Sequence, residues 1–366
     1  MLRAILGLLV ILSSAAAQTI IQQQGRLFGT GGIASTNPPS DGGQGSTVAI
    51  SGDGNTIAIA NPSDNDNLGA VWVFVRQNGT WSQQGTKIAP YSSPSVSATF
   101  GYSLALSGDG NILLAGAPAD IATGGAVWLF VRSGGTWSSG TKLTVSDESV
   151  FNPDSGHPEP PHSAFGEVVS ISSDGTKALI TGVYDNSCEE CLNGGPGTGG
   201  SLGAVWWFSG AGGVFSEMAK IAAPSSARFT GATVTANGLS GFIAGSLGGS
   251  LDTGEGSTPA VWQTTVGGAA GSPLLALSSS DRCIGSGAVS ANGSTLLVSP
   301  CVGHPQIYSG GVAGPTLIPN GGTSNAVSMV ALSGDGLTAA MGGATAPSVF
   351  WLFNNANGQW TQTLGP

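Results

Sequence analysis

The side chains in this sequence best able to do chemistry are carboxylates that lie in stretches rich in glycine, proline and serine. Two suitably spaced carboxyl groups are enough to hydrolyse a glycosidic bond, and carboxylates also bind partners directly. The candidates for a carboxylate pair are Glu159, Asp185, Glu189, Glu190, Asp252 and Glu255. Asp154 lies in the same stretch as Glu159 and is a further binding candidate. Spacing along the chain does not bring any two of these groups together, so catalysis and binding both stay open.

Histidine could add a metal ligand or a catalytic base. The chain has three histidines, and His157 and His162 share the proline-rich stretch 152–164. His-Pro and Pro-Pro dipeptides favour exposed turns over a metal site, so we treat both histidines as binding candidates. The sequence lacks H-E-x-x-H and a phosphate-binding glycine loop. We therefore predict no metal, no cofactor and no catalytic residue.

The elements that position these residues must be mostly β-strands. Glycine and proline account for 61 and 20 of the 366 residues, and only 8% of residues are charged. Glycine and proline cost about 1 and 3 kcal/mol per position inside a helix. Hydrophobic residues nevertheless make up 40% of the chain and include nine Trp, which excludes a disordered protein.

A turn motif recurs along the chain and marks an internal repeat. It reads S-G-D-G or S-S-D-G in four copies and A-N-G in two. The copies begin at Ser51, Ser107, Ser172, Ala236, Ala291 and Ser333. A β run follows each turn, then a variable loop and an alternating strand such as Gly69–Phe74. A fourth strand is visible in the clearer copies, so each repeat holds four short strands.

One sheet of four short strands cannot bury both faces, whereas radial stacking of six or seven such sheets can. We predict an all-β fold: a single β-propeller over residues 18–366 with six four-stranded blades, seven being the alternative. The recurrent Trp on the third strand is expected to be core between blades. The segment Ile20–Leu27 resembles a fourth strand and is expected to join the last blade, but Gln359–Leu364 also reads as a fourth strand, so the order at the sheet edge stays open.

Strand order assigns the connections to two faces of a propeller. Connections after strands one and three are tight turns and define the short-turn face. Connections after strands two and four include the long insertions 146–164, 185–202 and 246–258, and they define the long-loop face. Because variable loops on a rigid scaffold commonly carry function, we predict binding at the long-loop face, with tolerated insertions as the alternative.

The repeats resemble the FG-GAP repeat of integrin-alpha-type propellers. The resemblance rests on Phe100-Gly101 and Phe165-Gly166, on Gly116-Ala117-Pro118, and on the strand G-A-V-W-[VL]-F. It is specific in the first three copies and degenerate in the fourth and fifth. It implies a propeller, often of seven blades, used for adhesion or ligand binding, with calcium in many of its first-hairpin loops.

The calcium sites of that family do not carry over to this sequence. The family loop resembles D-x-[DN]-x-D-G-x-x-D and supplies several carboxylates, as a hard cation requires. Around Asp53 only the central aspartate remains, and the last ligand position is Ile57. Asp109, Asp174 and Asp335 are equally isolated. We interpret these aspartates as turn formers.

The N-terminal residues predict secretion. Arg3, the apolar run Ala4–Leu12 and three consecutive alanines are typical of a signal peptide over residues 1–17. Secretion permits disulfides among the four cysteines. Cys283 and Cys301 are equidistant from the hairpin centre at Asn292, which favours their pairing and leaves Cys188 with Cys191.

Charge and sequons complete the functional prediction. The net charge of -10 argues against nucleic acid, and no long apolar segment indicates a membrane span. Asn78 and Asn292 are sequons on the short-turn face. We predict a secreted, non-enzymatic propeller that binds an extracellular protein or glycan. The alternatives are a carbohydrate-active enzyme or lectin, and a structural surface repeat protein.

Overall fold

The computed structural model describes residues 27–36, 39–40, 43–90, 97–120, 124–145, 163–185, 202–224, 227–248, 258–268, 270–277, 284–300, 303–320, 327–343 and 350–365. The predicted signal peptide, residues 1–17, lies outside them. The described chain is built of β-strands, with one short helical segment, α1 (Asp64–Asn67), and a small hairpin of β1 (Ser35–Thr36) and β2 (Pro39–Ser40). In this part of the chain no helix is both long and apolar enough to cross a membrane.

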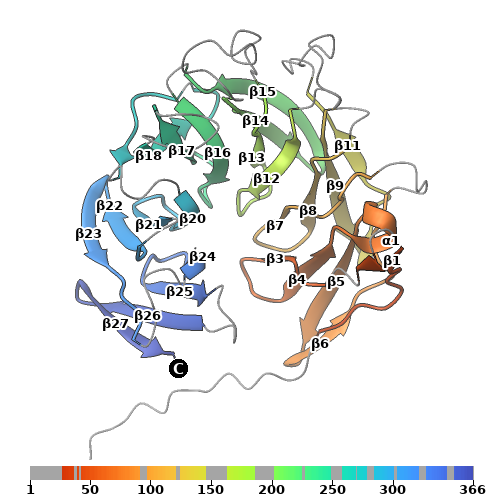
Figure 1. Ribbon diagram of the computed structural model, residues 1–366. Coiled ribbons are helices and arrows are strands. Elements are labelled where there is room, and N and C mark those ends of the chain that lie inside the picture. The colour runs from red at the N-terminus through yellow and green to blue at the C-terminus, as the bar shows by residue number, and fades with distance from the viewer. Residues whose placement is uncertain are drawn as a thin grey trace, which may run out of the picture.

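Six antiparallel sheets follow one another along the chain and are arranged in a ring (Figure 1). In order, the blades are blade 1, β3–β6 (Thr47–Ile50, Thr56–Asn61, Ala70–Gln77, Thr80–Gln83); blade 2, β7–β11 (Leu104–Leu106, Ile112–Ala117, Ala126–Ser133, Thr136–Trp137, Thr141–Leu143); blade 3, β12–β15 (Phe165–Ile171, Lys177–Gly182, Ala204–Ala211, Val214–Ala222); blade 4, β16–β19 (Ala227–Val234, Ser240–Leu247, Thr258–Thr265, Leu275–Ala276); blade 5, β20–β23 (Ile284–Val289, Thr295–Pro300, Gln306–Ser309, Val312–Thr316); and blade 6, β24–β27 (Val327–Leu332, Thr338–Gly343, Phe350–Ala356, Gln359–Leu364). The predicted all-β propeller of six blades is confirmed.

The first strand of every blade lies innermost. Residues of β3, β7, β12, β16, β20 and β24 together line a central cavity of about 430 Å³. Small residues dominate this lining because six strands converge there.

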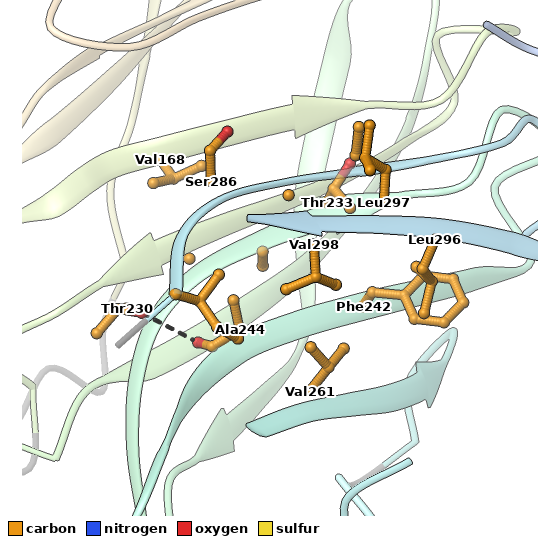
Figure 2. A pocket seen from close by; sticks show the side chains of 15 residues that line it. Val168, Thr230, Thr233, Phe242, Ala244, Val261, Ser286, Leu296, Leu297 and Val298 are labelled. Atoms are coloured by element: carbon orange, nitrogen blue, oxygen red, sulfur yellow. Dashed lines mark hydrogen bonds between the residues drawn. The ribbon is translucent and has the colours of Figure 1, made fainter. Parts of the chain in front are cut away.

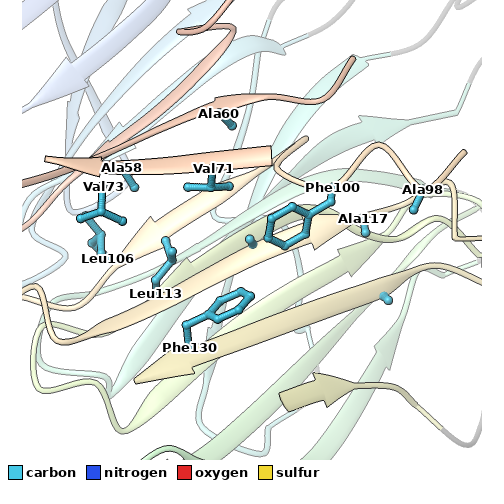
Figure 3. Packing of buried hydrophobic residues seen from close by; sticks show 12 residues of the cluster. Ala58, Ala60, Val71, Val73, Ala98, Phe100, Leu106, Leu113, Ala117 and Phe130 are labelled. Carbon is cyan, nitrogen blue, oxygen red and sulfur yellow. The ribbon is translucent and has the colours of Figure 1, made fainter. Parts of the chain in front are cut away.

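Apolar clusters hold neighbouring blades together. Between blades 1 and 2, Val71 and Val73 pack against Phe100, Leu113 and Phe130, all at most 3% exposed (Figure 3). Burying each such side chain stabilises the fold by about 1.5–3 kcal/mol. Stacked sheets thus bury the apolar faces that a single blade would expose.

The phenylalanine of each F-G pair ties one blade to the preceding one. The Phe100 amide donates to the carbonyl oxygen of Leu68 (3.0 Å), and the Phe165 amide donates to that of Gly124 (3.2 Å). A Cβ added at Gly69 would lie 2.1 Å from the Phe100 oxygen, so this contact requires glycine. The sequence pattern therefore encodes the junction between blades.

The third-strand tryptophans are core residues, as predicted. Trp206, Trp262 and Trp351 are at most 1% exposed and belong to clusters between consecutive blades. Trp72 differs, because its indole N–H donates to the Thr30 carbonyl oxygen (2.8 Å) and Leu27 packs beside it. The chain that precedes blade 1 thus covers this tryptophan.

Two segments were candidates for the fourth strand of the last blade, and the structure describes one of them. Strand β27 supplies the fourth strand of the last blade from the C-terminal end. Of the expected strand Ile20–Leu27, residues 20–26 lie outside the described residues. Side chains at the junction between blades 6 and 1 are more exposed than those at the same repeat positions between blades 1 and 2. Ile50 of blade 1 is 59% exposed, against 8% for Leu106 of blade 2. Phe350 of blade 6 is 53% exposed, against 0% for Val71 of blade 1.

The turn aspartates act within their own turns. The Ser107 hydroxyl donates to the Asp109 carboxylate (2.7 Å), which also accepts the Asn111 amide (3.0 Å), while the Ser107 oxygen accepts the Ile112 amide (2.9 Å). The same three bonds recur in the other five turns. The interpretation as turn formers is confirmed.

Backbone hydrogen bonds join the turns of successive blades. The donor amides and acceptor oxygens are Asp53 to Gly108 (3.1 Å), Gly108 to Ser173 (2.8 Å), Ser173 to Ala236 (2.8 Å), Ala236 to Ala291 (3.1 Å) and Ala291 to Gly334 (2.8 Å). A Cβ at Gly108 would lie 2.1 Å from the Ser173 hydroxyl oxygen, so this contact favours glycine. The short-turn face is therefore tied together across all six blades.

These turns make the protein sensitive to acid. The Ser51 hydroxyl lowers the pKa of Asp53 most strongly, and the Ser333 hydroxyl does the same for Asp335. Burial opposes the effect at Asp109, but the hydroxyl and amide donors outweigh it and its pKa is also lowered. The pKa of each of these aspartates in the folded protein lies below the ordinary value of 3.8. The stability that their hydrogen bonds contribute is therefore complete above pH 3.8 and is lost as the pH falls through the pKa of the folded state.

Replacing Asp53, Asp109, Asp174 and Asp335 together by Asn is expected to flatten this acid limb. Asn237 already accepts the same bonds in blade 4, so the variant should fold. Urea unfolding at several pH values below 5 measures the effect. An equally steep loss in the variant would show that other carboxyl groups cause it.

Candidate functional site

Antiparallel pairing of consecutive strands places the long connections on one face, as expected. Most of the predicted binding residues on that face lie outside the described residues and are not placed: Asp154, His157, Glu159, His162, Glu189, Glu190, Asp252 and Glu255. The described part of the long-loop face consists of strand ends and of the residues from which the loops leave.

Blades 1, 2 and 3 share one construction where the chain leaves their second strand. The amide of the glycine that opens the third strand donates to the carbonyl oxygen of an aspartate that follows the second. The pairs are Gly69 to Asp64 (3.0 Å), Gly125 to Asp120 (2.9 Å) and Gly203 to Asp185 (2.9 Å). This bond closes both the short connection 65–68 and the long one 186–202. We call the aspartate and the glycine that it joins the root of the loop, and the same root serves loops of different length.

A buried ion pair fixes each root. The aspartate side chains are at most 2% exposed, and each meets the ammonium of a lysine later in the same blade: Lys87 follows β6, Lys142 lies in β11 and Lys220 in β15. The pairs are Asp64–Lys87 (2.5 Å), Asp120–Lys142 (2.6 Å) and Asp185–Lys220 (2.8 Å). Removing one partner would leave an uncompensated buried charge, so the pair locks the root to the blade.

Asp185 is therefore a scaffold residue. Sequence placed it among the binding-face candidates, but its side chain is 0% exposed and lies against Lys220. The ammonium of Lys220 also lies 5.1 Å from the Trp206 ring centre, a cation–π contact within the same blade. A partner at the long-loop face would meet the loop that Asp185 anchors instead of Asp185 itself.

Two tyrosines and a glutamate form a described cluster on this face. Tyr102 follows Gly101 at the entry to blade 2, Glu167 is the third residue of β12, and Tyr184 follows β13. Each tyrosine is 45% exposed. The Tyr102 amide donates to the Thr99 and Gly116 carbonyl oxygens, which fixes its backbone. Exposed rings thus stand on rigid strand ends.

The Tyr102 and Glu167 side chains are coupled. Burial raises the pKa of Glu167, although the nearby Tyr102 hydroxyl acts in the opposite direction. Burial and the adjacent carboxylate raise the pKa of Tyr102, and Tyr184 is close enough to add to the effect. A partly buried carboxyl group with a shifted pKa is typical of functional sites.

Sequence reasoning missed both the cluster and the ion pairs. The paired aspartates stand at a constant spacing of eleven residues after the turn aspartates, a signal that was available in the sequence. The cluster had a weaker signal, since Tyr102 and Glu167 each follow an F-G pair. Among the described residues, no three His, Cys, Asp or Glu side chains gather as a metal site requires.

The cysteine prediction stays open. All four cysteines, Cys188, Cys191, Cys283 and Cys301, lie outside the described residues. The neighbours of the last two, Ile284 and Pro300, are register partners in the β20–β21 hairpin. Non-reducing peptide mapping tests the predicted Cys283–Cys301 and Cys188–Cys191 bridges, and free thiols would contradict them.

Both sequons lie on the short-turn face. Asn78 is exposed in the hairpin turn between β5 and β6 with φ of 49°. Asn292 is exposed in the turn between β20 and β21, where its side-chain oxygen accepts the Ser294 amide (3.0 Å). Their positions agree with the face assigned from sequence, and glycosylation itself stays a prediction.

Fold and strand order define this chain as a six-bladed β-propeller with its long connections on one face. No family model and no curated protein matches the sequence. Among solved structures it is similar to a Bacteroides uniformis protein whose proposed activity is that of a 6-phosphogluconolactonase, with a TM-score of 0.54 and 13% identity over 87% of this chain and 83% of that one. At this identity the likeness shows the fold alone.

Proposed function

We propose that this propeller is a secreted, non-enzymatic binding module that engages an extracellular glycan or protein through its long-loop face. The carrying observation is the cluster of Tyr102, Glu167 and Tyr184. Exposed tyrosines supply large contact area at little entropic cost, and they can stack on a sugar ring while a carboxylate bonds its hydroxyls. Secretion rests on the predicted signal peptide.

The loop roots support the same proposal. The bond and ion pair that close the short connection after Asp64 also close the long one after Asp185. A scaffold that holds loops of different length without changing its own geometry is the arrangement of a binding module. We also propose membership of the FG-GAP repeat family, because Phe100 and Phe165 make the contacts between blades.

A glycan-array and protein-ligand screen of the mature chain tests the proposal. Against any ligand found, Tyr102→Ala is expected to weaken binding about ten-fold or more, since interface tyrosines commonly cost at least about 1–2 kcal/mol on truncation. Leu239→Ala is the matched control, because Leu239 is 66% exposed in a turn of the opposite face. Equal losses in both variants would remove the site from this face.

A second candidate is a carbohydrate-processing enzyme. The raised pKa of Glu167 favours it, because a protonated carboxyl group can act as a general acid. In that case Glu167→Gln would abolish turnover on a glycosidase panel and retain binding. If the module only binds, wild type and variant would both lack turnover.

A further inference from the structure

Blade 5 lacks two aromatic rings that blades 2, 3 and 4 carry at equivalent positions. The first position, at the entry to the blade, holds Phe100, Phe165, Phe229 and, in blade 5, Ile284. The second, on the third strand, holds Trp128, Trp206, Trp262 and, in blade 5, Gln306. Both positions of blade 5 face blade 4.

In blades 3 and 4 these rings fill the junction with the preceding blade. Phe165 and Trp206 meet edge to face with ring centres 5.4 Å apart, and Phe229 and Trp262 do so at 5.1 Å. Gln306 does not replace a ring, since its side chain bonds the Gly314 carbonyl oxygen and the Tyr308 hydroxyl.

Glycines at the same junction leave further space. A Cβ at Gly287 would find only the Leu297 oxygen at 3.7 Å, and one at Gly231 only Val168 at 4.0 Å. The neighbouring strand glycine Gly245 is tightly enclosed, since a Cβ there would lie 1.9 Å from the Arg228 oxygen. The position of Gly287 therefore tolerates a side chain.

The result is a pocket of about 300 Å³ between blades 4 and 5. Figure 2 shows Phe242, Val261 and Val298 around it. Its few hydroxyls are engaged: Thr230 donates to the Ala244 carbonyl oxygen (3.3 Å), and the Ser286 oxygen accepts an amide from blade 6. None of the lining residues that the structure describes is charged. Such a pocket selects an apolar guest and disfavours water.

We propose that this pocket binds an uncharged aromatic group of the size of an indole or phenyl ring. The guest takes the place of the rings that Phe229 and Trp262 supply at the neighbouring junction, so the protein's own packing defines its shape. Val168, which follows Glu167 along β12, is among the lining residues, but neither Tyr102 nor Glu167 lines the pocket, and the proposal does not rest on the function proposed above.

Calorimetric titration with indole tests the site. Wild type is expected to show one saturable binding event, and indole should raise its Tm. Ile284→Phe and Gly287→Val fill the pocket, the first with the residue that blades 2, 3 and 4 carry there and the second with the valine of blade 3, Val169. Each should weaken indole binding at least ten-fold and raise the Tm of the free protein.

Ile284→Leu is the control, because it keeps the volume of the side chain and should keep indole affinity. A parallel titration with N-acetyltryptophanamide, which carries the tryptophan side chain on a peptide-like backbone, shows whether the pocket takes a free small molecule or an aromatic side chain of a partner. Absence of a saturable indole event in wild type would overturn the proposal, as would undiminished binding by Gly287→Val. Binding to a glycan or protein at the long-loop face is measured separately and does not decide the result.

Discussion

Lys220→Met is expected to lower the free energy of unfolding by about 3–5 kcal/mol, because it leaves the buried Asp185 carboxylate without its cation. The two side chains are 14% and 0% exposed, so solvent cannot replace the ammonium. The variant also loses the contact with the Trp206 ring. Urea unfolding at neutral pH followed by circular dichroism measures the effect.

Two further variants separate charge from packing. Lys177→Met alters a half-buried lysine of the same blade that forms no ion pair in the described part of the chain, and it should change stability by less than about 0.5 kcal/mol. The double variant Asp185→Asn, Lys220→Met should recover much of the loss. A double variant as unstable as Lys220→Met alone would show that packing, and not charge, holds the root.

Blade 4 already illustrates the coupled loss of both charges. It carries Gly248 and Leu274 at the positions of Asp185 and Lys220, and the blade is intact. The apolar Leu274 packs against the cluster that includes Val261. A blade therefore folds with both charges or with neither, which is the behaviour expected of a buried pair.

Much of the fold could be predicted from the sequence, because the signals are local and repeated. The turn formed by Ser107 and Asp109 is specified within six residues, and the alternating third strands set which side chains face the core. The spacing of these turns also gave the number of blades. Period and turn chemistry are properties of short segments, so they need no knowledge of tertiary contacts.

The candidate site could be predicted only in part. Sequence placed the long connections on one face, but the exposure of Asp185 depends on whether Lys220, in another strand, reaches it. The cluster of Tyr102 and Glu167 joins two blades, and a pair of this kind leaves no trace in local spacing. Ring closure stayed ambiguous for a similar reason, because segments 20–27 and 359–364 carry equivalent sequence patterns that local spacing does not rank.

Shortening one long loop is expected to abolish partner binding without unfolding the propeller. Residues 186–202 are replaced by residues 121–124, which connect the equivalent strands of blade 2. The design keeps the bond from Gly203 to Asp185, and the new glycine supplies the carbonyl oxygen that accepts the Phe229 amide, as Gly124 does for Phe165. The Tm should therefore change by only a few degrees.

The matched control changes the opposite face. Replacing Asn78 and Asn292 by Gln removes any glycan attached there and should leave affinity unchanged. The loop replacement should weaken binding about 100-fold or more, equivalent to about 2.8 kcal/mol and within the range of a lost hot-spot cluster. If the asparagine variants weaken binding and the loop replacement does not, the partner binds the short-turn face. In that case the long connections would be tolerated insertions. The ion pairs at their roots would then serve only to stabilise the blades.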